Sequence, residues 1–156
     1  MIRYHSAVLI TKDIEGMTRF YKDVLEQPLR FDFGRCQIFE CGLSVWELDE
    51  NDPAMAATGI GKGTNSCLEL CFETEEFEKE ASRILDLKPK LLHGVAEEAW
   101  GQRTIRFFDP DGNLVELGES IPCFCRRLYR EGLCIEAVAN KTGVSIDNVK
   151  EYVGRA

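Results

Sequence analysis

The sequence has few of the residues that mark a membrane protein or a structural zinc protein. It contains only two histidines among 156 residues and no Cys-x-x-Cys pair, so a paired-cysteine zinc site is excluded. No apolar run approaches the roughly 20 residues that a membrane-spanning helix needs. The first residues also lack the apolar stretch of a signal peptide. We therefore expect a cytoplasmic protein with no membrane partner.

Basic residues are in the minority. Nineteen Lys and Arg stand against 27 Asp and Glu, which leaves a net charge of −8. Because basic side chains neutralise nucleic-acid phosphates, this balance argues against nucleic acid as a partner and permits a metal ion or a cationic ligand. The seven cysteines are an odd number, which disfavours a disulfide framework and indicates reduced thiols. With 44% hydrophobic and 29% charged residues, the chain has an ordinary globular composition.

One order of predicted elements occurs twice. Each copy begins with a strand and an amphipathic helix, which starts at Asp13 in the first copy and near Glu76 in the second. Three short strands then follow in each copy, at residues 29–33, 36–40 and 43–48, and at 90–94, 103–108 and 113–119. The polar stretch 49–65 between the copies is predicted to be a linker. This repeat predicts two similar β-α-β-β-β modules, at residues 3–48 and 67–119.

The chain changes character after the second module. Residues 120–156 are the more basic part and show a helical pattern, so we predict a core domain at residues 1–119 and a C-terminal helical tail at 120–156. The spacing of Ala139, Gly143 and Val149 is found in helix-turn-helix proteins, but any helical hairpin joined by a glycine shares it. Because the tail carries few basic residues, packing on the sheets or support of a dimer is the favoured role.

Two segments resemble one known superfamily. Residues 13–15 and 20–25 (Asp-Ile-Glu, then Phe-Tyr-Lys-Asp-Val-Leu) resemble its first helix, and residues 100–103, 107–113 and 115–117 resemble the end of its second module. The superfamily is the vicinal-oxygen-chelate group of glyoxalases, bleomycin-resistance proteins and extradiol dioxygenases. The resemblance implies an α+β fold in which two βαβββ modules form curled mixed sheets around a cavity. It does not select the reaction, because this fold hosts enzymes and non-catalytic binders.

The resemblance also implies a metal or ligand site built from the first and last strands of each module. Matching residues 46–48 with residues 115–117 makes Glu47 and Glu116 the last-strand candidates. The first-strand candidate of the second module is Glu69, where family enzymes commonly have histidine. We therefore expect Glu47, Glu69 and Glu116 to bind a divalent cation such as Ni²⁺, Co²⁺, Mn²⁺, Mg²⁺ or Zn²⁺.

The fourth metal ligand stays open between two neighbours. Glu69 lies seven residues before Glu76, and the same count back from Asp13 reaches Ser6, with His5 one residue away. Successive strand residues point to opposite faces, so only one of His5 and Ser6 faces the cavity unless a bulge intervenes.

Four further side chains are candidates for substrate binding. Trp46 and Trp100 are able to line a pocket for a planar or apolar ligand, although aromatic strand residues more often belong to the core. Arg103, like Arg106, is able to bind a substrate carboxylate, although surface salt bridges are the commoner role of such arginines. His93 could approach the mouth of the cavity, but a surface position is the stronger expectation.

Two functions follow from the resemblance. The first is a metal-dependent lyase or isomerase, in which the cation holds a small oxygenated substrate and Glu116 or Glu47 moves a proton between adjacent carbons. The alternative is a non-catalytic binder of the bleomycin-resistance type that sequesters a cationic or aromatic small molecule. An extradiol dioxygenase is a weaker third reading, because it needs two histidines and one carboxylate. In each case we expect a homodimer, as in many family members.

Overall fold

The structure is a computed structural model that describes residues 5–49, 51 and 68–154. The predicted linker at 49–65 lies almost wholly outside the described residues, as does the start of the first predicted strand. The chain divides into two compact units, one of residues 1–68 with 108–114 and the other of residues 69–107 with 115–156. Each unit is described by itself.

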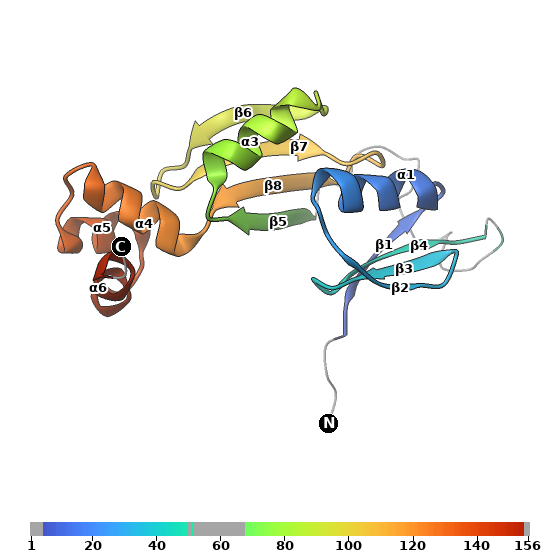
Figure 1. Cartoon of the computed structure of the whole chain (residues 1–156), viewed down its shortest axis with the longest axis horizontal. Helices are drawn as coiled ribbons and strands as arrows, with labels where there is room; N and C mark the ends of the chain where they lie inside the picture. The colour runs from blue at the N-terminus through green and yellow to red at the C-terminus, as the bar shows by residue number, and fades with distance from the viewer. Residues whose placement is uncertain (1–4, 50, 52–67, 155–156) are drawn as a thin grey trace. The chain divides into compact units, whose positions relative to one another are not determined.

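The described residues of the first unit form one four-stranded mixed sheet and one helical segment. In chain order its elements are β1 (Ala7–Thr11), α1 (Ile14–Arg19), the π-helix η1 (Phe20–Val24), β2 (Leu29–Asp32), β3 (Cys36–Phe39) and β4 (Leu43–Glu47). The strands lie in the order β1-β4-β3-β2, with β1 and β4 parallel and the other neighbours antiparallel (Figure 1). The first βαβββ module is therefore confirmed.

The sequence explains where this helical segment begins and ends. The Asp13 side chain accepts a hydrogen bond from the backbone N–H of Gly16 at 2.9 Å, which confirms Asp13 as the predicted N-cap. The helical segment ends at Val24. The reason is local, because Glu26 has a left-handed backbone conformation with φ of 52° and cannot continue a helix.

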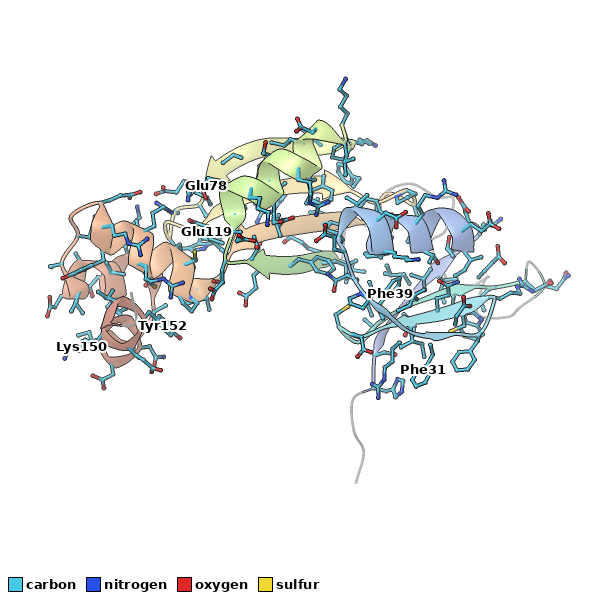
Figure 2. The ribbon with its side chains drawn as sticks, viewed as in Figure 1. Phe31, Phe39, Glu78, Glu119, Lys150 and Tyr152 are labelled. Atoms are coloured by element: carbon cyan, nitrogen blue, oxygen red, sulfur yellow. The ribbon has the colours of Figure 1, made fainter. Side chains whose placement is uncertain are left out.

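The core of the first unit lies between this helical segment and one face of the sheet. Met17 and Tyr21 are completely buried, as are Phe39 and Val45 on the strands. The rings of Tyr21 and Phe39 lie 5.8 Å apart, and Figure 2 shows Phe39 between helix and sheet. None of the unit's described helical residues lies on the opposite face of this sheet, and we call it the open face of the first sheet.

The second unit repeats the pattern. Its elements are β5 (Glu69–Thr74), α3 (Phe77–Asp86), β6 (Leu91–Glu97), β7 (Arg103–Phe108) and β8 (Leu114–Glu119), with the last residue of β7 and the first of β8 assigned to the first unit. The strand order is β5-β8-β7-β6, and Figure 1 shows β5 and β8 running in the same direction. Phe77, Ala81 and Ile84 of α3 are buried against the sheet. The α+β fold with two βαβββ modules is thus confirmed.

Three helices follow the second sheet, as the sequence pattern predicts. They are α4 (Ile121–Arg130), α5 (Ile135–Thr142) and α6 (Ile146–Gly154). Phe124, Leu128, Val138 and Val149 form a buried cluster among them. Gly143, with φ of 73°, ends α5 in the left-handed conformation that glycine adopts without strain. None of the described helices is long and apolar enough to cross a membrane.

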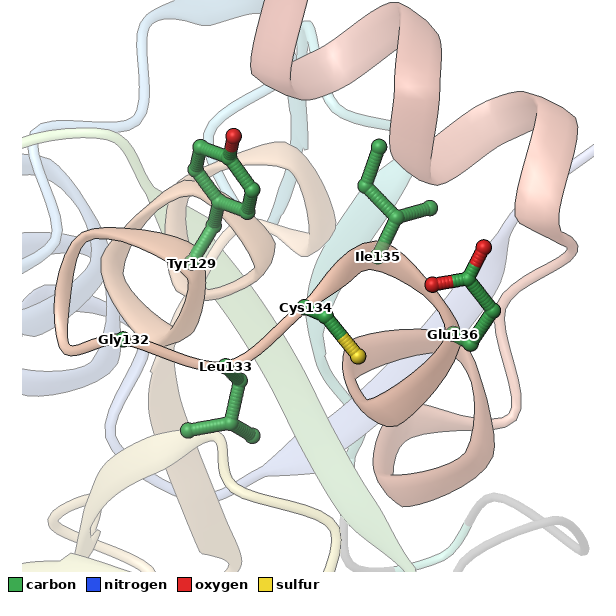
Figure 3. A pocket seen from close by; sticks show the side chains of 6 residues that line it. All are labelled: Tyr129, Gly132, Leu133, Cys134, Ile135 and Glu136. Atoms are coloured by element: carbon green, nitrogen blue, oxygen red, sulfur yellow. The ribbon is translucent and has the colours of Figure 1, made fainter.

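A hollow on the tail lies at the junction of α4 and α5. It is lined by Tyr129, Gly132, Leu133, Cys134, Ile135 and Glu136 (Figure 3). It is an open surface feature, and none of its residues belongs to the predicted site.

Candidate functional site

The pairing of the first and last strands in each sheet shows which residues of the two modules correspond. This correspondence differs from the one obtained by matching residues 46–48 with residues 115–117. In the first sheet Thr11 pairs with Glu47. In the second sheet the carbonyl of Thr74 accepts a hydrogen bond from the N–H of Ser120 at 2.9 Å. In a parallel ladder that bond joins a residue to the position after its partner, so Thr74 pairs with Glu119. The structural counterpart of Glu47 is therefore Glu119 and not Glu116.

The equivalence of the two strand-end threonines supports this register. The hydroxyl of Thr11 accepts from the N–H of Asp13 at 2.9 Å, and the hydroxyl of Thr74 accepts from the N–H of Glu76 at 3.1 Å. The predicted match of Asp13 with Glu76 is thus confirmed. The match of residues 46–48 with 115–117 is wrong by three positions, and an odd shift moves a side chain to the other face of its sheet.

Glu47 accordingly lies on the helix-covered face of the first sheet. It shares that face with Thr11 and Val45, which are completely buried. Its carboxylate is 3.3 Å from the Nε of Arg35. His5 is exposed, and its Nδ1 lies 3.1 Å from the hydroxyl of Ser6. Glu47 and His5 belong to the first unit, so their convergence with acids of the second unit stays a prediction.

The second unit brings Glu69 and Glu116 together around an arginine. The Nε of Arg106 donates to Glu69 at 2.6 Å, and its Nη2 forms an ion pair with Glu116. Its Nη1 donates to Glu98 and lies 3.2 Å from the Nε2 of His93. We call these five side chains the Arg106 cluster.

Strand alternation explains why the Arg106 cluster forms on one face. On β7, Ile105 and Phe107 are completely buried toward α3, so Arg106 between them points to the other face. On β8, Val115 and Leu117 are likewise buried, and Glu116 points the opposite way. The Glu116 side chain is nevertheless only 9% exposed. The neighbours Val115 and Leu117 are therefore buried on one face of the sheet, and the Glu116 side chain is buried on the other face.

The surroundings shift the pKa values of Glu116 and Glu98 in opposite directions. Burial raises the pKa of Glu116 above its ordinary value, and the nearby Glu69 and Glu98 raise it further, while Arg106 opposes both effects. The pKa of Glu98 is lowered, chiefly by its hydrogen bond from Arg106. Burial lowers the pKa of Arg106, but its bonds to Glu69 and Glu98 outweigh that effect and leave it raised. Glu116 therefore holds a proton more readily than Glu98 does.

His93 completes the cluster as a hydrogen-bond acceptor. Its Nδ1 lies 2.7 Å from the carbonyl oxygen of Gly94, which can only accept, so Nδ1 carries the proton. Nε2 is then the acceptor for the guanidinium of Arg106. The side chain of His93 is partly buried against Arg106, and its expected surface position stays a prediction.

The donor atoms of the cluster do not fit a divalent metal as they are arranged. Glu69, Glu98 and Glu116 each direct an oxygen at Arg106, and His93 directs its available nitrogen there as well. Across the described part of the chain, no group of three His, Cys, Asp or Glu side chains is placed to hold a metal ion. The guanidinium supplies the positive charge that these acids need.

Arg103 lies on the opposite face of the second sheet from Glu116. Its guanidinium bonds Glu119 at 2.7 Å and Glu78 at 2.6 Å, and it lies 5.5 Å from the ring centre of Phe77 on α3. Figure 2 labels the two acids, Glu78 and Glu119. These contacts place Arg103 between the helices and the sheet, so the structure does not bring it to the Arg106 cluster. Its predicted contact with substrate stays a prediction.

The aromatic candidates lie apart from the charged cluster. Trp46 is 41% exposed on the open face of the first sheet, and Phe33 on the same face is 66% exposed. The rings of Phe31 and Phe33 are stacked with centres 5.9 Å apart. Trp100 belongs to the second unit, where its indole N–H donates to Gln102 at 3.0 Å. The open face of the first sheet is thus an aromatic surface.

The sequence contained a signal for the centre of the cluster. Arg106 alternates with Ile105 and Phe107 along β7, just as Glu116 alternates with Val115 and Leu117 along β8. This pattern places both charges on the side away from the apolar residues. The partnership of Glu98 with Arg106 has no comparable signal, because Glu98 lies in the turn after β6.

These observations define a two-module α+β protein with an ionisable cluster on the face of its second sheet that lies opposite α3. A model of the glyoxalase-like domain matches residues 4–122 of the sequence. The chain therefore belongs to the glyoxalase-like domain family, within the vicinal-oxygen-chelate superfamily. No curated protein matches this chain.

Several solved structures are similar in fold. A protein of unknown function from Agrobacterium tumefaciens str. C58 is 30% identical, with a TM-score of 0.68 over 78% of this chain and 96% of that one. A lactoylglutathione lyase from Agrobacterium tumefaciens is 24% identical, with a TM-score of 0.58 over 76% and 93%. A fosfomycin resistance protein from Listeria monocytogenes is 20% identical, with a TM-score of 0.56 over 77% and 94%. The last two likenesses concern the fold alone.

Proposed function

We propose that this glyoxalase-like chain is an enzyme of the lyase or isomerase type that moves a proton on a small oxygenated substrate. The carboxylate of Glu116 is the group that takes and returns the proton. The observation that carries this proposal is the environment of Glu116, a nearly buried acid whose pKa is raised by burial. A carboxyl group with a raised pKa is a better proton acceptor near neutral pH than an ordinary glutamate.

The neighbours of Glu116 suit this chemistry. Removal of a proton beside a carbonyl puts negative charge on an oxygen, which a fixed positive charge stabilises in a site of low dielectric constant. Arg106 is such a charge, and its ion pairs with Glu69 and Glu98 hold it in position. The metal dependence expected from the resemblance is not part of the proposal, because the donor atoms of the cluster are bound to Arg106.

The test is exchange of carbon-bound hydrogen in D₂O, followed by proton NMR. The substrates are small α-hydroxyketones, 2-oxoaldehydes and their thiol adducts, each with the wild-type chain after chelator treatment. We expect exchange at the carbon beside the carbonyl, and a loss of about 100-fold or more in Glu116→Gln, the size typical of a general base. Glu73→Gln on β5 is the matched control. Equal exchange in the wild type and Glu116→Gln would overturn the proposal.

The second candidate function is non-catalytic binding of an aromatic or cationic small molecule. The exposed aromatic surface of Phe31, Phe33 and Trp46 favours it, because planar ligands stack on such rings. Titration of tryptophan fluorescence with planar aromatic amines tests this function. Saturable quenching that is lost in Trp46→Ala, without hydrogen exchange on any substrate, would favour the binder over the enzyme.

Two further parts of the proposal concern assembly and location. We expect a homodimer and a cytoplasmic location. The six described cysteines are unpaired, which supports a reducing compartment.

A further inference from the structure

We propose that the guanidinium of Arg106 is the resident cation of this site, in place of a divalent metal. The resemblance to the superfamily implies that Glu69 and Glu116 are metal ligands. In this proposal they are instead the carboxylate partners of an arginine. The inference concerns the cation alone and holds whether or not the chain moves a proton on a substrate.

The contacts of Arg106 carry the proposal. Its Nε donates to Glu69 at 2.6 Å, and Nη1 is shared between Glu98 and His93. Nη2 is paired with Glu116. The guanidinium thus lies at the centre of the cluster and contacts all four side chains that are able to bind a metal. A coordinated cation would need the same position. A metal and the guanidinium would compete for the same oxygen atoms and would repel each other.

Two chemical properties make the replacement permanent in the folded chain. Arginine does not lose its proton at any pH at which proteins are folded, so Arg106 cannot become neutral to admit a metal. Its planar fork is also suited to several carboxylates at once, whereas lysine would present a single point charge. The second oxygens of the carboxylates do not change this, because no described group of three ligands is arranged for a metal.

The charges of the cluster set the consequence of removing Arg106. Three carboxylates against one guanidinium already leave the cluster with an excess of acidic side chains. Without Arg106, three acids and the free Nε2 of His93 would surround an empty centre with no positive charge. Oxygen and imidazole donors of this kind bind Zn²⁺, Ni²⁺, Co²⁺ and Mn²⁺. The variant Arg106→Met, which keeps side-chain volume without charge, should therefore acquire a metal site.

The experiment compares metal content and thermal stability in four forms of the full chain. Wild type, Arg106→Met, Arg106→Lys and Arg103→Met are treated with chelator and titrated with Zn²⁺, Ni²⁺, Co²⁺ and Mn²⁺. We expect no stoichiometric metal and no shift of the melting temperature in wild type. Arg106→Met should bind one equivalent and gain roughly 5 °C at a metal concentration about 100-fold above Kd. Addition of Glu116→Gln to Arg106→Met should abolish the gain.

The controls separate this site from general effects of charge. Arg106→Lys retains a positive charge and should gain no metal. Arg103→Met removes an ion-paired arginine from the opposite face and should also gain none. The proposal is overturned if wild type binds one equivalent of metal and loses it in Glu69→Gln or Glu116→Gln. It is also overturned if folded Arg106→Met gains no metal. Should Arg106→Met not fold, Arg106→Gln replaces it, and the wild-type stoichiometry still decides.

Discussion

The hydroxyl of Tyr21 donates a hydrogen bond to the carboxylate of Asp109 at 2.8 Å, although 88 residues separate them in the sequence. Both side chains are buried, and the amide of Asn113 donates to the same carboxylate oxygen at 2.7 Å. Burial, followed by the charge of Asp109, raises the pKa of Tyr21 well above its ordinary value. This bond ties the turn at 109–112, contributed by the second module, to the helical segment of the first unit.

Loss of this bond should weaken the fold. In Tyr21→Phe the buried carboxylate of Asp109 loses one of its donors, which should lower the free energy of unfolding by about 1–3 kcal/mol. Urea denaturation measures the change. Tyr129→Phe removes the hydroxyl of a largely exposed tyrosine and should have almost no effect. Equal stabilities of the two variants would show that the Tyr21 bond contributes nothing.

Glu119 should be the acid whose neutralisation destabilises the chain most. Its side chain is 1% exposed and bonds Arg103 at 2.7 Å and Arg127 at 2.8 Å. Glu119→Gln removes the charge that compensates two guanidinium groups, so we expect a loss of about 3 kcal/mol in urea denaturation. Glu75→Gln, which removes an exposed partner 3.8 Å from Arg126, should change stability by less than about 0.5 kcal/mol. A small effect at Glu119 would contradict a structural role for this network.

Glu116 and Glu119 should affect the pH dependence of stability in opposite directions. Burial raises the pKa of Glu116 above 4.5, so its ionisation costs stability as the pH rises through that raised value. The pKa of Glu119 is lowered below 4.5 because the bonds from Arg127 and Arg103 outweigh its burial. Its stabilisation is therefore full above pH 4.5 and is lost as the pH falls through the lowered value.

The measurement is a series of urea midpoints between pH 3.5 and 8 for wild type, Glu116→Gln and Glu119→Gln. With rising pH, wild type should lose stability relative to Glu116→Gln, and it should gain stability relative to Glu119→Gln in the acid range. Curves that run parallel for both variants would mean that neither pKa is shifted in the folded chain.

The predicted homodimer is tested by measuring the molar mass of the protein in solution. Light scattering at micromolar concentration should give twice the 17.7 kDa of one chain. A mass of one chain at that concentration would contradict the predicted homodimer.

Local sequence signals were sufficient for the elements of this fold. The strand Arg103–Phe108 was predicted with its observed bounds, and Asp13 was identified as a helix cap. Capping, alternation and turn-forming residues act within a few positions of the chain, so the sequence shows them directly. The same alternation of charged and apolar residues surrounds Glu116 and Arg106, although the shared face of these two residues was not among the predictions.

Strand register and ionic partners were decided by the tertiary structure alone. Residues 46–48 and 115–117 look equivalent in sequence, but hydrogen bonds to distant strands pair Thr74 with Glu119 and put Glu47 on a helix-covered face. Likewise, Arg106 reaches Glu69 across 37 positions of sequence. Such contacts depend on which strands lie side by side and in which register, and a pattern confined to one strand carries no record of its neighbour. The sequence by itself determined the two modules and pointed to Glu69 and Glu116, and the tertiary structure decided that Arg106 pairs with both of these acids and with Glu98.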